Sequence, residues 1–470
     1  MRTCCTLLAA LLSATPAARA TDTWPHSVET SLRDNRIPDS AVSLLVLPVD
    51  GAKPLIAHRA DEAMTPASVM KVVTAWAALE NLGPAHVWQT RLLASEAQRD
   101  GVLTGNLHIV GGGDPRLSRE RLWQMLRDLR MRGVQRIAGD VLIDRSVFRL
   151  PPHDPAAFDQ RPLRPYNMGA DALQVDYGAL PVRLTPTPTG ARILMDPPFE
   201  GLQLESQVQR SGGVCADPTA GLGATTERTG SGITLRIEGT LPEACTQDFV
   251  WNLSPVSPTR LFEALFRSLW HELGGEIDGQ FRDAPAPSHT TLLTESPSPP
   301  LAEVIRDMNK WSNNVIARHL LATLGNLEHG DEDSVSRGVR KIVDTLRSSG
   351  ISTAGLVIEN GSGLSRRERI SARSLAQVLQ HAWRGRHMPE LLASLPIAGV
   401  DGTARKRFAG TPASGNAHIK TGTLDGVRSL AGYVLGVSGR RYIVVMMINH
   451  THAAASREAQ NLLLEWVARH

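Results

Sequence analysis

The chain is short of lysine and cysteine, and it has almost no excess of either charge. Its 50 basic residues face 47 acidic ones, and no basic run marks a nucleic-acid-binding or membrane-seeking face. Nothing after the first twenty residues is apolar for long enough to span a bilayer. The remaining composition is that of an ordinary globular protein, and 470 residues favour two or three domains.

The first twenty residues have the pattern of an export signal. Arg2 supplies the positive charge, 6–14 is a short apolar stretch, and Ala18-Arg19-Ala20 is a small-x-small cleavage site. Cys4 and Cys5 precede the apolar stretch, where the acceptor cysteine of a lipoprotein would follow it, so a lipid anchor is not expected. We therefore expect cleavage after Ala20 and an exported mature protein with no transmembrane segment.

Removing this leader leaves only two cysteines, Cys215 and Cys245. In an oxidising compartment we expect them to form a disulfide, the alternative being two separate buried thiols. In the chain-entropy model, closing a loop of about 30 residues stabilises the fold by about 3–4 kcal/mol.

Both ends of the chain are rich in strand signals. Two apolar runs, 41–48 and 54–58, flank Asp50-Gly51 and predict a hairpin. Near the other end, three strands are predicted at 417–423, 427–435 and 441–449, and helices are predicted at 68–82 and 454–468. The fold class is therefore α+β, with these strands in one antiparallel sheet covered by helices.

The middle of the chain differs from both ends in its pattern of residues and is predicted to form inserted modules. Residues 103–144 suggest a βαβ unit, proline-rich 180–252 favours short strands, 259–273 is helical, and 285–300 reads as a linker. We divide the chain into a signal peptide (1–20), a terminal domain (21–88 and 282–470), an inserted domain II (89–184 and 249–281) and a β-rich domain III (185–248).

One of the few lysines of the chain lies in the motif Ser68-Val69-Met70-Lys71. Only six lysines occur, at positions 53, 71, 310, 341, 406 and 420. Arginine cannot be deprotonated in a protein, so a lysine retained three residues after a serine suggests a titratable amine that activates a nucleophile. The alternative is an N-cap serine beside a solvated lysine.

A second lysine lies in Lys420-Thr421-Gly422, followed by Thr423, on a predicted strand. Lys420 and Thr421 can bind a carboxylate, and Gly422 would let a ligand backbone approach closely. A second positive charge near Lys71 would also lower the pKa of Lys71. An ordinary edge strand with a protective lysine is the alternative.

The tripeptide Ser312-Asn313-Asn314 lies between a predicted helix ending near Lys310 and another that runs to Leu324. Ser312 can relay a proton and Asn314 can bridge the base and a substrate carbonyl, whereas helix capping is the alternative. No metal or cofactor is expected. His450 and His452 lack a third ligand, and Gly111–Asp114 lacks the end of a phosphate-binding loop.

These motifs, in this order, resemble those of the penicillin-recognising serine enzymes. Further segments extend the resemblance to the class C low-molecular-mass penicillin-binding proteins, the D-alanyl-D-alanine carboxypeptidase/endopeptidases: Thr65–Ser68, Gly112–Pro115, Gly139–Asp144, Asn360–Leu364, Leu395–Thr403 and Lys420–Leu424. The resemblance covers nearly the whole mature chain. It implies a serine β-lactamase/transpeptidase-like catalytic domain that carries inserted smaller α/β and β-rich domains.

The resemblance also implies a periplasmic or wall-facing enzyme, with a particular site and reaction. Ser68 would attack the carbonyl of the penultimate D-alanine, and Lys71 would accept its proton. Ser312 and Asn314 would assist proton transfer and substrate placement. Lys420 and Thr421 would bind the terminal carboxylate, and the N–H groups of Ser68 and Thr423 would form the oxyanion hole.

The expected partners are peptidoglycan stem peptides and, as inhibitors, β-lactam antibiotics; nucleic acid is not expected, and a homodimer is left open. Two alternatives remain at this stage. One is a β-lactamase or esterase of the same architecture, against which the long insertion argues. The other is a non-catalytic cell-wall or β-lactam sensing module, which would have no need of Lys71.

Overall fold

The computed structural model describes residues 24–51, 53–196, 201–229 and 232–470. The predicted signal peptide and its cleavage after Ala20 lie outside the described residues. Within these ranges, no helix is both long and apolar enough to cross a membrane.

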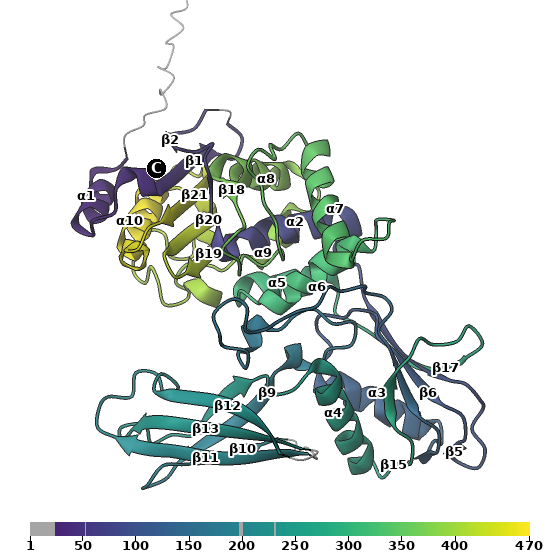
Figure 1. Cartoon of the computed structure of the whole chain (residues 1–470). Coiled ribbons are helices and arrows are strands. Elements are labelled where there is room, and N and C mark those ends of the chain that lie inside the picture. Colours follow the sequence, from purple (N-terminus) through teal and green to yellow (C-terminus); the bar gives the residue numbers. More distant parts are fainter. Residues whose placement is uncertain (1–23, 52, 197–200, 230–231) are drawn as a thin grey trace, which may run out of the picture.

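The two ends of the chain share one antiparallel sheet, as the sequence predicts (Figure 1). In spatial order its strands are β19 (Ala417–Leu424), β20 (Val427–Leu435), β21 (Arg441–Asn449), β1 (Val42–Pro48) and β2 (Ile56–His58). β1 lies between β2 and β21, and Leu44 is opposite Met446. The early hairpin and the last strands therefore belong to one folding unit.

Helices bury both faces of this sheet. Helices α1 (His26–Asp34) and α10 (Arg457–Ala468) cover one face. The other face carries α2 (Met70–Leu82), α5 (Leu301–Lys310), α6 (Asn314–Gly325), α7 (Ser334–Ser348), α8 (Ala372–Arg384) and α9 (Met388–Ser394). Successive side chains of a strand point to opposite faces. Leu44 accordingly joins the core of α10, while Leu45 joins the core of α2.

A second sheet lies in the inserted part of the chain. Its order is β16 (Phe281–Asp283), β8 (Val141–Asp144), β6 (Leu107–Val110), β4 (Gln89–Ala94) and β17 (Thr291–Pro297). β6 and β8 are parallel and flank α3 (Arg119–Met131) in the chain, which gives the predicted βαβ unit. A small sheet of β15 (Glu276–Ile277), β7 (Arg136–Ile137) and β5 (Val102–Leu103) and helix α4 (Pro258–Glu272) complete this module.

Strand β17 falls inside 285–300, so reading that whole segment as a linker is wrong. The strand pairs with β4 at the edge of the sheet, where the missing N–H of Pro297 costs little. Since β16 and β17 both belong to the inserted sheet, we propose that the return to the terminal domain lies after Pro297 and not at 282.

The β-rich module contains two three-stranded sheets. One joins β10 (Ala191–Met195), β9 (Leu180–Pro186) and β14 (Phe249–Leu253), and the other joins β11 (Leu202–Ser211), β13 (Gly232–Pro242) and β12 (Leu222–Thr229). β11 and β13 are parallel, so the loops that follow them begin side by side. Cys215 and Cys245 lie in those two loops and form the expected disulfide.

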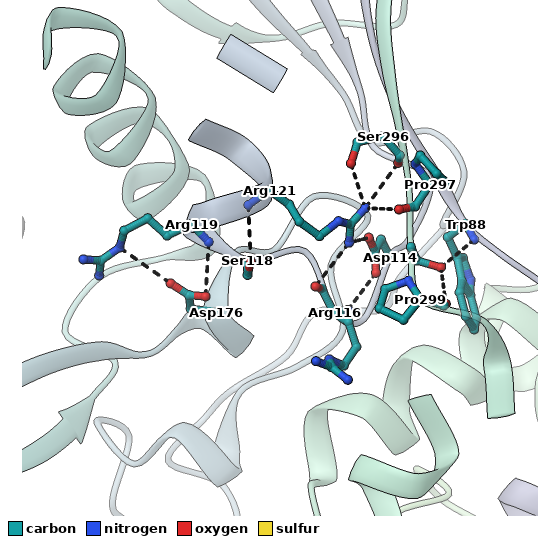
Figure 2. A network of polar contacts seen from close by, with 11 residues as sticks. Trp88, Asp114, Arg116, Ser118, Arg119, Arg121, Asp176, Ser296, Pro297 and Pro299 are labelled. Carbon is teal, nitrogen blue, oxygen red and sulfur yellow. Dashed lines mark hydrogen bonds and ion pairs between the residues drawn. The ribbon is translucent and has the colours of Figure 1, made fainter. Parts of the chain in front are cut away.

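A polar network around Arg121 lies where the inserted module meets the terminal domain (Figure 2). Arg121 forms an ion pair with buried Asp114 and donates to Ser296 Oγ at 2.9 Å and to the carbonyl oxygen of Pro297 at 2.6 Å. Arg116 pairs with Asp307 on α5. The inserted module is therefore attached to the helix that ends just before Ser312, and the Gly-Gly-Asp-Pro motif is structural.

We predict that the double substitution Cys215→Ser/Cys245→Ser destabilises the β-rich module by about 3–4 kcal/mol, because the unfolded loop regains its freedom. Thermal unfolding with and without the disulfide measures this loss. The rate of penicillin acylation should stay unchanged, and a comparable fall in that rate would contradict the structural role.

Candidate active site

The candidate nucleophile lies just before the first long helix. Ser68 occupies the 3-10 turn η2 (Ala67–Val69), and Lys71 lies in the first turn of α2. Lys71 Nζ is 3.0 Å from Ser68 Oγ. A Cβ on Gly363 would lie 1.8 Å from the carbonyl oxygen of Ala67, so only glycine allows the 360–364 loop to approach this turn.

Lys71 is completely buried and has three oxygen atoms within reach of its amine. Besides Ser68 Oγ, these are Asn314 Oδ1 at 2.7 Å and the carbonyl oxygen of Ser362 at 2.5 Å. A neutral amine can donate two N–H groups to the two carbonyl-type oxygens and accept the Ser68 hydroxyl proton on its lone pair. The arrangement therefore suits an amine that acts as a base.

The surroundings of Lys71 favour that neutral form. Burial lowers the pKa of Lys71 well below its ordinary value, and the positive charges of Lys420 and Arg318 lower it further. The carboxyl group of Glu368 acts in the opposite direction. Burial and the positive charge of Lys420 therefore lower the pKa of Lys71 together, and the effect of Lys420 is the one that the sequence suggests.

Lys420 is the second buried lysine of the site. It lies on β19, which packs against η2, and its Nζ donates to Ser312 Oγ at 2.9 Å and to the carbonyl oxygen of Thr421 at 2.7 Å. Burial lowers the pKa of Lys420 to about 7. Each lysine therefore contacts one serine: Lys71 contacts Ser68, and Lys420 contacts Ser312.

The three residues of Ser312-Asn313-Asn314 have different roles. Asn313 caps α6, because its Oδ1 accepts from the N–H of Ile316 at 3.1 Å, so the capping alternative holds for this residue. Ser312 adopts a left-handed φ of 58° and points to Lys420, while Asn314 begins α6 and contacts Lys71. The structure thus brings Ser312 and Asn314 to the two lysines.

Gly422 also has a role within the protein. A Cβ at this position would lie 2.1 Å from Ser429 Oγ and 2.7 Å from the carbonyl oxygen of Pro66. The glycine therefore accommodates β20 and the turn that precedes Ser68, and the close approach of a ligand backbone stays a prediction. Ser429 Oγ in turn donates to Pro66, which fixes the serine turn against the sheet.

Sequence reasoning did not assign Thr403, whose Oγ1 lies 2.9 Å from Thr421 Oγ1. An ion pair between Lys310, which is buried, and Asp401 holds this loop: Nζ to Oδ2 is 2.7 Å, and Asp401 Oδ1 accepts from the N–H of Ile397 at 2.8 Å. The Leu395–Thr403 segment belongs to the family resemblance seen in the sequence. That resemblance is the signal from which Thr403 could have been assigned to the site.

Glu368 and the carbonyl group of Ser362 were also missed. Glu368 is fully buried, and its Oε1 accepts N–H groups of Glu359, Asn360 and Gly361 at 2.9–3.1 Å. These bonds shape the loop whose Ser362 carbonyl contacts Lys71. Burial raises the pKa of Glu368. A backbone carbonyl group that accepts a hydrogen bond, and a carboxylate that only shapes a loop, cannot be recognised from the spacing of residues in the sequence.

The reacting side chains open into a cleft of about 670 Å³. Its walls include Ser68, Ser312, Thr421 and Thr423 together with several basic residues. The arrangement offers a nucleophile and a buried base. It also offers a second lysine, hydrogen-bonded to a serine that can relay a proton, and two threonine hydroxyl groups in contact with each other. Such a set can transfer an acyl group from an amide that carries a nearby carboxylate.

Comparisons with known proteins agree over nearly the whole chain. A D-alanyl-D-alanine carboxypeptidase from Actinomadura sp. (strain R39) is 30% identical over 94% of this chain and 85% of its own length. The crystal structure of penicillin binding protein 4 (dacB) from Haemophilus influenzae superposes with a TM-score of 0.78 at 24% identity, covering 93% of this chain and 99% of that one. A second structure of that protein contains a β-lactam, with a TM-score of 0.75 at 24% identity over 94% and 99% of the two chains.

The family model of the D-Ala-D-Ala carboxypeptidase 3 (S13) family matches residues 25–470, from the first described helix to the last residue. The resemblance inferred from the motifs and the fold inferred from the strand pattern are therefore confirmed. The chain belongs to the D-Ala-D-Ala carboxypeptidase 3 (S13) family.

Proposed function

We propose that this protein is a periplasmic serine D-Ala-D-Ala carboxypeptidase that also cleaves peptidoglycan cross-links as a DD-endopeptidase. The observation that carries the proposal is the buried amine of Lys71, 3.0 Å from Ser68 Oγ and held by Asn314 and Ser362. The family match and the predicted export signal support the substrate class and the compartment.

Acylation begins when the proton of Ser68 Oγ passes to Lys71 Nζ and the oxygen attacks the carbonyl carbon of the penultimate D-alanine. The N–H groups of Ser68 and Thr423 stabilise the oxyanion. Lys420 and Thr421 hold the terminal carboxylate. The C–N bond then breaks, and Ser312 gives its proton to the leaving amine and regains one from Lys420, with which it is hydrogen-bonded.

Before deacylation, solvent in the cleft takes the proton from Lys71 and returns one to Lys420, so that Lys71 is neutral again. Lys71 then accepts a proton from the attacking water and passes it to Ser68 Oγ as the bond between the acyl carbon and Ser68 breaks. A β-lactam enters the same first step and leaves an acyl group on Ser68. Rapid turnover of that adduct would favour the β-lactamase alternative, and failure to form it would favour a non-catalytic module.

We expect fluorescent penicillin to label the wild-type protein and to leave the Ser68→Ala variant unlabelled, because Ser68 Oγ is the hydroxyl group that contacts the proposed base Lys71. Gel fluorescence of both proteins at equal concentration measures this. Label that survives on the alanine variant would place the nucleophile elsewhere and sink the assignment.

Replacing Lys71 by arginine keeps the positive charge but removes the titratable amine. We expect the penicillin acylation rate to fall on the order of 10²–10⁴-fold, the usual contribution of a general base. Lys341→Arg is the matched control, since Lys341 pairs with Glu328 outside the cleft. A Lys71→Arg variant that acylates at the wild-type rate would exclude Lys71 as the base.

The acylation rate should depend on pH through both lysines. It rises with pH as Lys71 loses its proton, and this occurs well below the ordinary lysine pKa. Above about pH 7, Lys420 loses the charge that holds the carboxylate, so the rate falls again. A penicillin methyl ester has no carboxylate, so its alkaline fall in stopped-flow measurements should be smaller and should reflect only the proton that Lys420 gives to Ser312. Identical profiles for acid and ester would contradict the role of Lys420 in holding the carboxylate.

A further inference from the structure

The cleft that contains Ser68 has an unusually basic wall. Four arginines line it, and three of them, Arg407, Arg428 and Arg457, come from three separate parts of the chain. Arg407 follows the turn that carries Thr403, Arg428 lies on β20 and Arg457 begins α10. We call these three residues the arginine wall. Arg405 and Lys406 add two exposed positive charges to the same cleft.

In the part of the chain that the structure describes, no acidic side chain forms an ion pair with the arginine wall. Among the ion pairs formed by the described residues, none includes Arg407, Arg428 or Arg457. Burial and the charges of Arg457 and Arg428 together lower the pKa of Arg407 to about 10. Three guanidinium groups that repel one another favour a bound anion.

A buried amide points to the same conclusion. Gln460 lines the cleft with 2% of its surface exposed, and its Nε2 has no hydrogen-bond partner among the described residues. Its Oε1 lies 3.5 Å from Arg407 Nη2. A buried N–H group without an acceptor costs free energy, so this position also suits an anionic oxygen atom.

The wall lies beside the residues that hold the terminal carboxylate. Arg428 is directly opposite Thr423 in the β19–β20 pair, so the two side chains share one face of the sheet. Arg405 and Arg407 follow Thr403, which contacts Thr421. An anion at the wall would therefore belong to the part of the substrate that departs after acylation.

The two proposed activities release different leaving groups. A carboxypeptidase releases D-alanine, whose single carboxylate is already bound by Lys420 and Thr421. Cleavage of a cross-link releases a whole second stem peptide, an acidic peptide with carboxylates beyond the one next to the cleaved bond. Only this second leaving group supplies further anionic groups that could reach the wall.

We propose that Arg407, Arg428, Arg457 and Gln460 form a subsite for a carboxylate of the departing acidic stem peptide, and that this subsite favours cross-links over terminal D-alanine. The inference rests on the proposed function. Arg457 is the residue to vary, because its side chain is exposed and takes part in none of the ion pairs of the described residues.

The test measures kcat/KM of purified wild-type, Arg457→Gln and Arg457→Glu proteins on a cross-linked muropeptide dimer and on a monomeric pentapeptide. We expect the dimer-to-monomer ratio to fall on the order of tenfold in Arg457→Gln and further in Arg457→Glu, since each loses a charge-assisted contact. Arg469→Gln, at the far end of the same helix, is the matched control and should keep the wild-type ratio.

A second substrate makes the result specific. Amidating the carboxylates of the departing strand, except the one next to the cleaved bond, should lower the wild-type ratio and should have little further effect in Arg457→Glu. Equal losses on dimer and monomer, an unchanged ratio, or additive effects of amidation and substitution would each overturn the subsite. Failure of the proposed function looks different: the wild-type protein would cleave neither peptide and would not bind penicillin covalently.

Discussion

The arrangement of the active site depends on one buried amine. Lys71 has no exposed surface, and the oxygen atoms around it are a hydroxyl and two neutral carbonyl-type groups. Its nearest charged neighbours include Lys420 and Arg318, which repel a proton on Lys71, and only Glu368 opposes them. The free-energy cost of burying a charge thereby keeps the amine that faces Ser68 in its neutral form, which can accept a proton.

The fold serves this requirement by joining distant segments. The first hairpin and the last three strands form one sheet, and the turn before α2 is fixed to that sheet through Ser429 and Pro66. The 360–364 loop closes over the turn because Gly363 has no side chain. The inserted module is attached at Asp307 of α5, the helix that leads to Ser312. Each part positions one side of the cleft.

Much of this could be predicted from the sequence. Alternating apolar strands, a helix after Pro66 and two lysines in a lysine-poor chain gave the sheet, the serine turn and the cluster of motifs. What could not be predicted depends on folded proximity. Strand β17 is an edge strand with proline at its end, Ser362 acts through its backbone, and Glu368 acts through three N–H groups. The arginine wall unites three segments, and arginine is too common in this chain to stand out.

The low lysine count allows the central claim to be measured directly. Protein labelled with ¹³C at lysine Cε has at most six lysine resonances, and a Lys71→Arg variant identifies one of them. We expect the Lys71 resonance to report a neutral amine at moderately alkaline pH, with its midpoint well below the ordinary lysine value. A Lys71 amine that keeps its proton up to the ordinary lysine range would contradict the account.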